Sequence, residues 1–92
     1  MDGRTRDEAA AERFGRNLFL SRRRAGLSQE RLAALCSLHR TEIGLLEQGR
    51  RLPRVDTLLK LVAALAVDPS DLLKGIDWVP GTERGGGFVV KP

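Results

Sequence analysis

The order of apolar and polar positions along this chain follows the period of an α-helix over most of its length. In the stretch 5–25 the residues of one face recur at intervals of three and four positions, so a long first helix is predicted there. The members of this face are Phe14, Leu18, Ser21, Arg22 and Ala25. Phe19 and Leu20 lie outside it, and we expect them to be partly exposed or to contact a partner. Gly26 follows directly and is a typical stop for a helix.

Two short helices are predicted next, over 28–36 and 40–48, with a short turn between them. Ser28 is a suitable N-cap for the first of these helices, and Gly49 ends the second. Their expected inward residues are Leu32, Ala33, Leu35, Ile43 and Leu46. The arrangement is therefore one of helix, short turn and helix.

The segments 56–66 and 68–75 are predicted as a fourth and a fifth helix. Apolar residues occur nearly all round the fourth helix, so we expect it to lie at the centre of the core. Asp68 is the expected N-cap of the fifth helix, and Pro69 occupies its first position. The pattern as a whole predicts an all-α fold, with a five-helix domain over residues 1–75.

The composition changes after this domain, where glycine and proline accumulate before an apolar run at 88–90. Two conformations remain open for the tail of residues 76–92. It forms a β-hairpin that pairs 76–79 with 88–90, or it is an extended arm.

The composition narrows the possible functions of the chain. The formal net charge is +4, and arginine supplies most of the positive charge, with 13 Arg against 3 Lys. Arginine forms forked hydrogen bonds to phosphates and to guanine, which favours a nucleic-acid partner. The arginine excess of a GC-rich genome is the alternative explanation. Cys36 is the single cysteine, so the chain has no internal disulfide and no cysteine metal cluster. The charged start of the chain and the absence of a long apolar run predict a cytoplasmic protein, which a nucleic-acid partner would associate with the nucleoid.

Residues 14–74 resemble the Cro and phage-repressor-like helix-turn-helix family, of the xenobiotic-response-element type. The resemblance rests on GLSQERLAALCSLHRTEIGLLEQGRRLP at 26–53 and on DTLLKLVAALAVDPSDLL at 56–73. The matching positions are Leu27, Ser28, Gln29, Glu30, Leu32, Ala33, Ile43, Glu47, Gln48, Gly49, Arg50, Arg51 and Pro53. Ser37 departs from the glycine that the family usually has in the turn.

The resemblance implies that the helix over 40–48 lies in the major groove of duplex DNA. The implied base-reading residues are Arg40, Thr41, Glu42, Gly44 and Leu45. Arg40 would donate two hydrogen bonds to guanine, and Leu45 would offer only an apolar contact to a thymine methyl. Glu42 would accept from cytosine or cap its own helix, and Gly44 would permit close approach. Because hydrogen-bonding groups are few here, part of the specificity is expected to rest on DNA shape.

The resemblance also implies contacts to the phosphates on both sides of this helix. The implied residues are Ser28, Gln29, His39, Gln48, Arg50, Arg51 and Arg54. Amides at the start of the helix over 28–36 are expected to help. The alternative for the basic loop is a merely solvated surface. His39 is expected to cap its helix or to contact phosphate, because no second ligand or base accompanies it.

Arg22 and Glu47 occupy positions that pair in this family, so Glu47 is expected to be structural and not catalytic. No catalytic residue, metal site, cofactor or small-molecule ligand is expected, since the sequence has no serine elbow, phosphate loop or metal-ligand spacing. Relatives often dimerise through the part that follows the fourth helix. The expected dimerisation residues are Ile76, Trp78, Phe88, Val89 and Val90, unless Trp78 covers the bottom of the core.

The sequence thus predicts a transcriptional regulator, a repressor, that binds a pseudo-palindromic operator as a homodimer. A symmetric dimer would meet two half-sites about 34 Å apart on one face of the DNA. The alternative is a protein-interaction module, similar to a coactivator or an antitoxin, that keeps the fold without reading DNA. The exposed positions 19 and 20 and the apolar tail favour this alternative, and the basic loop argues against it.

Overall fold

The structure is a computed structural model that describes residues 6–82 and 85–92. Over these residues it contains five helices followed by one hairpin, which confirms the predicted all-helical domain. The elements are α1 (Arg6–Arg24), α2 (Gln29–Cys36), α3 (Arg40–Glu47), α4 (Val55–Leu65), α5 (Pro69–Leu72), β1 (Ile76–Thr82) and β2 (Gly85–Val90). None of the described helices is both long enough and apolar enough to cross a membrane.

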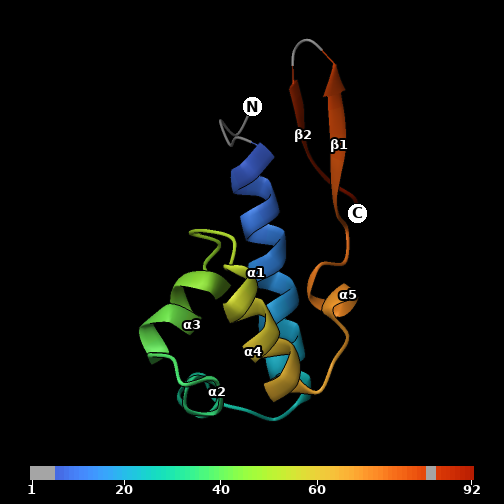
Figure 1. The fold of residues 1–92 in the computed structure, drawn as a ribbon. Coiled ribbons are helices and arrows are strands. Elements are labelled where there is room, and N and C mark those ends of the chain that lie inside the picture. The colour runs from blue at the N-terminus through green and yellow to red at the C-terminus, as the bar shows by residue number, and fades with distance from the viewer. Residues whose placement is uncertain (1–5, 83–84) are drawn as a thin grey trace.

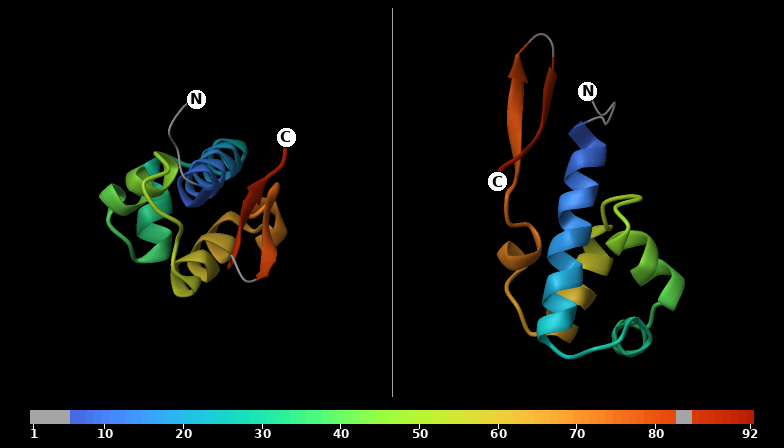
Figure 2. Two further views of the ribbon diagram at one scale, coloured as in Figure 1. Left: turned by 90° about the horizontal axis from the view of Figure 1, so that it is seen from above. Right: turned by 180° about the vertical axis from the view of Figure 1, so that it is seen from behind.

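Helix α1 is the longest element, and the others are arranged around it (Figure 1). It contacts α3 on one side and α5 on another, while α2 lies between α3 and α4. The hairpin runs beside the N-terminal half of α1, at the opposite end of the molecule from α2 (Figure 2). Helix α2 and the hairpin therefore lie toward opposite ends of α1, whereas α3 meets the middle of α1 at Gly15.

The core is built mainly from leucine and lies where α1 meets the shorter helices. Its fully buried side chains are Phe14, Leu18, Leu32, Ile43, Leu61 and Leu72. Burying one such side chain contributes about 1.5–3 kcal/mol, so each short helix is held by tertiary contacts more than by its own propensity. Cys36 is buried among these residues.

Two predictions of burial were wrong. Leu35 is 48% exposed, because α2 turns Leu32, Ala33 and Cys36 inward and carries Leu35 on its other side. Helix α4 is also not buried all round. It buries Leu61 and Leu65 but leaves Val55 74% exposed and Leu59 59% exposed. Helix α4 therefore carries more apolar side chains than the core of the domain buries.

The ends of the helices follow the predicted chemistry. The Ser28 side chain accepts a hydrogen bond from the Arg31 backbone N–H and caps α2. Asp68 caps α5 through a reciprocal capping box with Asp71. Ser37 ends α2 in the left-handed region, at φ 54°. A side chain there costs about 1 kcal/mol relative to glycine, so the turn between α2 and α3 is mildly strained.

The tail forms the hairpin and not the extended arm. Ile76 pairs with Val90 and Trp78 with Phe88, and the Trp78 and Phe88 rings meet edge to face with 5.1 Å between their centroids. The hairpin base is tied to α1 by side chains, as the Arg13 guanidinium donates to the Lys91 carbonyl at 2.6 Å. Asn17, on the next turn of α1, donates to the Leu72 carbonyl at 2.9 Å.

Gly15 permits the close contact between α1 and the end of α3. A Cβ atom at this position would lie 2.5 Å from the Leu46 carbonyl oxygen and 2.6 Å from that of Glu47. Both neighbours are backbone atoms, so they cannot move aside without shifting α3. Sequence analysis gave no role to Gly15.

Replacing Gly15 by alanine is therefore expected to destabilise the fold by about 1–3 kcal/mol, although alanine is the better helix former. Urea unfolding followed by circular dichroism measures this change. The matched control is Gly44→Ala in α3, where the added Cβ meets open space. That variant is expected to gain about 0.5–1 kcal/mol. Equal effects of the two substitutions would contradict the close approach at Gly15.

Candidate nucleic-acid interface

The buried side of α3 determines which of its residues remain available to a partner. Ile43 and Leu46 are buried in the core. The residues on the other side form what we call the outer face of α3. These are Arg40 and Thr41, which are exposed, and Glu42, Gly44 and Leu45, which are partly exposed. Arg40, Thr41, Gly44 and Leu45 thus lie on the side of α3 that faces away from the core, whereas Glu42 lies at its edge, in a pocket with Leu46 and Leu52.

Gly44 leaves a gap in the middle of this outer face. A Cβ atom built at Gly44 would have no heavy atom within 4 Å, so packing within the chain does not require glycine there. Glycine also lowers helix stability relative to alanine. A helix that carries glycine without an internal packing reason is suited to close approach by another molecule.

The orientation of α3 depends on a buried ion pair with α1. Arg22 Nε lies 2.6 Å from Glu47 Oε2, and Arg22 Nη2 donates to Glu47 Oε1 at 3.0 Å. The two side chains are only 9% and 7% exposed. The hydrogen bond to Glu47 raises the pKa of Arg22 above its ordinary value. The third guanidinium nitrogen, Nη1, donates to the Leu27 carbonyl at 2.9 Å, which fixes the segment that leads into α2.

Gln29 joins this network at the first position of α2. Its Nε2 donates to Glu47 Oε1 at 3.0 Å, so one side chain of α3 holds both α1 and α2. The predicted phosphate contact of Gln29 is untested by this structure. Its amide nitrogen already has an acceptor inside the protein, which leaves its amide oxygen and its backbone for an external contact.

Polar groups at the start of α2 make more contacts within the protein than the sequence suggested. The Arg31 backbone N–H donates to the Ser28 hydroxyl at 3.0 Å. The carboxylate of Glu30 accepts from its own backbone N–H, and this bond, together with the charge of Arg40, lowers the pKa of Glu30. The Arg31 amide therefore already has an acceptor at the start of α2, and phosphate contact by the other amides stays a prediction.

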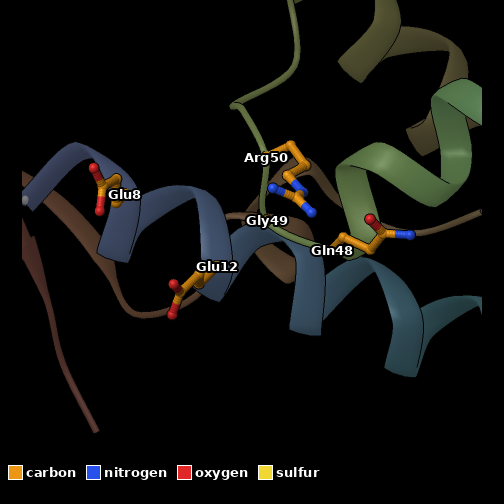
Figure 3. Close-up of a pocket in the computed structure, with 5 residues that line it drawn as sticks. All are labelled: Glu8, Glu12, Gln48, Gly49 and Arg50. Atoms are coloured by element: carbon orange, nitrogen blue, oxygen red, sulfur yellow. The ribbon is translucent and has the colours of Figure 1, made fainter. Parts of the chain in front are cut away.

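The loop between α3 and α4 carries the densest positive charge beside the outer face. Gln48, Arg50, Arg51 and Arg54 are all exposed. Arg54 makes only a long ion pair with Asp56, at 3.4 Å, and its side chain is 88% exposed. Figure 3 shows Glu8 and Glu12 extending from α1 on the far side of an open pocket that Gln48, Gly49 and Arg50 complete. The basic loop is thus bounded by acidic residues on the side of α1.

Arg40 has a partner that sequence analysis missed. Its Nε lies 2.8 Å from Glu30 Oε1, while both side chains stay more than 60% exposed, at 62% and 64%. The two residues begin consecutive helices, and only the turn between α2 and α3 brings those helix starts together. The sequence did contain a signal for this ion pair, because opposite charges stand on the first turns of two helices that are joined by a short turn.

His39 is the N-cap residue of α3 by its backbone, but its side chain makes no capping hydrogen bond. The capping role predicted for its side chain was therefore wrong. Its carbonyl oxygen accepts from the Glu42 N–H instead, which begins the helix without help from the imidazole. The alternative prediction, a phosphate contact by this exposed side chain, is untested.

The five expected dimerisation residues do not form one exposed surface. Trp78 is 56% exposed, so it does not cover the core, and its neighbour Val79 is 48% exposed. Ile76 packs against the core, and the three residues of β2 are partly buried. Within the described part of the hairpin, Trp78 and Val79 are therefore the exposed large hydrophobic residues.

The described residues offer little for catalysis or metal binding. No group of three or more histidine, cysteine or acidic side chains among them is placed to hold a metal ion. Burial raises the pKa of the Cys36 thiol, which disfavours the reactive thiolate.

Two short helices joined by a tight turn, with an exposed second helix beside a basic loop, define the architecture of a helix-turn-helix domain. Residues 13–73, more than half of the 92 residues, match the sequence family described as "Helix-turn-helix domain". The chain belongs to this helix-turn-helix family, as the resemblance in its sequence implied.

Several known proteins are similar to this chain. The control protein C.BamHI of Bacillus amyloliquefaciens is 46% identical over 50 residues, which are 54% of this chain and 62% of that protein. The uncharacterized HTH-type transcriptional regulator y4dJ of Sinorhizobium fredii is 38% identical over 72% of this chain and 86% of its own length. The crystal structure of the restriction–modification controller protein C.AhdI from Aeromonas hydrophila matches with a TM-score of 0.67 and 41% identity, over 70% of this chain and 97% of that one.

Replacing Glu47 by alanine is expected to destabilise the protein by about 3–5 kcal/mol, because it leaves the Arg22 charge buried without its partner. The free energy of unfolding in urea measures this loss. The control is Asp77→Ala in the hairpin, which breaks an exposed ion pair with Lys91 of 2.9 Å. Such a pair contributes about 0–1 kcal/mol. A loss below about 1 kcal/mol for the Glu47 variant would show that the buried pair does not hold α3.

Proposed function

We propose that this protein is a transcriptional regulator that binds duplex DNA in a sequence-specific manner, with α3 in the major groove, and that it acts as a repressor. The observation that carries the proposal is the outer face of α3. A helix held from behind by buried contacts presents Arg40 and Thr41 to the outside, beside three exposed arginines of the following loop. The regulators among its relatives support the same function.

The chemistry of the outer face suits base edges in the major groove. The groove is about 12 Å wide and admits one helix. Arg40 offers donors to guanine, Thr41 offers a hydroxyl and a methyl group, and Leu45 offers an apolar contact to thymine. The gap at Gly44 removes a side chain where α3 would lie nearest the bases, and the bend of the DNA would contribute the remaining specificity.

The arginines of the loop serve a different purpose in this proposal. Arg50, Arg51 and Arg54, together with Gln48, would contact phosphates on one side of the groove, and Ser28, Gln29 and His39 would do so on the other. Such contacts release counterions and provide most of the affinity without reading sequence. They would hold the outer face of α3 against the bases.

A protein-interaction module with the same fold is the second candidate function. Phe19 is 40% exposed, as the sequence predicted, and the guanidinium of Arg23 lies 5.7 Å from its ring centroid. This apolar and cationic surface could receive another protein. A salt titration of duplex binding separates the two functions, because DNA contact gives a steep log–log slope and the interaction module gives a flat one.

Two arginine variants test the division of roles between base and phosphate. Arg40→Ala is expected to cost about 1–3 kcal/mol on the preferred sequence and to relax preference at one base pair. Arg50→Ala is expected to weaken binding to all sequences alike and to reduce the salt slope by about one. Selection of bound duplexes from a random pool, followed by salt titration, measures both effects. If the Arg40 variant keeps the selectivity of the wild-type protein, then Arg40 does not read a base.

The proposal includes a homodimer on a pseudo-palindromic operator. The hairpin is the expected interface, and Trp78 with Val79 supplies its exposed apolar part. The division of the chain into residues 1–75 and a dimerisation arm of 76–92 remains part of this proposal. The exposed apolar side of α4, with Val55 and Leu59, is a competing surface for the second copy.

A pair of double variants is expected to locate the dimer interface. Changing Trp78 and Val79 to serine should convert the dimer to a monomer and weaken binding to a two-half-site operator more than to one half-site. Changing Val55 and Leu59 to serine should leave the dimer intact. Sedimentation velocity at micromolar concentration distinguishes the species. The opposite result would show that the interface lies on α4. If the wild-type protein is a monomer both free and on operator DNA, the proposed dimer is wrong.

A further inference from the structure

The contact between Glu30 and Arg40 has a specific geometry. Glu30 Oε1 lies 2.8 Å from Arg40 Nε, and the carboxylate of Glu30 is also held by its own backbone N–H. Glu30 lies at the start of α2, and it engages Arg40 through Nε, the inner nitrogen of the guanidinium. The Arg40 side chain stays 62% exposed, so its guanidinium can still meet another acceptor.

This geometry bears on how Arg40 can meet a base. A guanidinium forks onto guanine O6 and N7 with two of its N–H groups, which can be the terminal pair or the edge that contains Nε. With Nε engaged by Glu30, the terminal pair is the fork that remains. A side chain held in this way has already lost much of the rotamer freedom that binding would otherwise remove.

The charge of Glu30 bears on binding to unrelated DNA. A free arginine on the outer face would pair with any phosphate that came near, because that contact carries no sequence information. Glu30 neutralises Arg40 and places a negative charge where a phosphate would approach. Guanine can still be bound, since its acceptors are neutral and match the terminal fork.

We propose that Glu30 is a specificity-determining residue that positions Arg40 for guanine and withholds it from phosphates. The proposal rests on the proposed function, in which Arg40 reads a base. It assigns Glu30 a role in discrimination between sequences, beyond its place in the helix-turn-helix pattern. Because its side chain is 64% exposed, this role is separable from stability.

The test compares wild-type protein with Glu30→Gln and Glu30→Ala in the full chain. Glutamine keeps an oxygen that can accept from Arg40 but removes the charge, and alanine removes both. Preference at the base pair read by Arg40 is expected to fall about fivefold for glutamine and further for alanine, within the range set by one forked contact. Binding to random duplex is expected to strengthen, with a salt slope steeper by about one as Arg40 becomes free to hold a phosphate.

A matched control is Asp56→Asn, which removes the same charge from another exposed arginine–carboxylate pair. Arg54 in that pair is assigned to phosphate, so the control is expected to change affinity for all sequences equally and to leave every base preference unchanged. Thermal unfolding of all variants shows whether the fold is retained. A position-specific change in Glu30→Gln that is absent from Asp56→Asn supports the proposal.

Three other results would overturn it, and each has a distinct meaning. If Arg40→Ala relaxes one base pair while Glu30→Gln changes no base preference, then Arg40 reads the base without help from Glu30. If Arg40→Ala leaves selectivity unchanged, then base reading by Arg40 fails as well. If wild-type protein does not bind duplex with a salt-dependent affinity, then the proposed function itself fails.

Discussion

The buried contact between Arg22 and Glu47 is the interaction on which the placement of α3 depends. Removing two charges from water is costly, and the ion pair compensates only when its geometry is good and its remaining groups are bonded. Here three guanidinium nitrogens have acceptors, and Glu47 also accepts from Gln29. One carboxylate thereby fixes α1, α2 and α3 relative to one another. Hydrophobic packing alone would allow small rotations of α3, whereas directional hydrogen bonds do not.

This constraint explains how so short a helix can present a defined outer face. Helix α3 has 8 residues and would not be stable alone. It is held by two buried side chains, by the ion pair at its C-terminal end, and by the close approach of α1 at Gly15. All these contacts lie on one side. The opposite side carries the residues proposed to meet DNA and contributes none of the buried side chains of α3, so its chemistry can serve a partner.

The sequence predicted much of this fold because its helices are amphipathic and their ends carry specific capping residues. Ser28, Asp68 and the strained turn at Ser37 are local features, and local physics was enough to place them. Burial around α4 was predicted incorrectly, because periodicity cannot show how much of an apolar surface a neighbour covers. The pairing of Glu30 with Arg40 and the contact at Gly15 depend on how separate helices meet, which no pattern within one segment contains. The interface residues followed from family resemblance, whereas their partners within the protein required the structure.

The attachment of the hairpin to α1 has a mechanical consequence. Arg13 donates to the Lys91 carbonyl at the base of the hairpin, Asn17 donates to the Leu72 carbonyl at the end of α5, and Arg22 on the same helix binds Glu47. An α-helix rises 1.5 Å per residue, so the attachment at Arg13 and the one at Arg22 are about 14 Å apart along a stiff rod. A force applied to the hairpin is therefore transmitted as a tilt of that rod, and α3 must follow. Helix α1 thus links the attachment of the hairpin to the buried contact that orients α3.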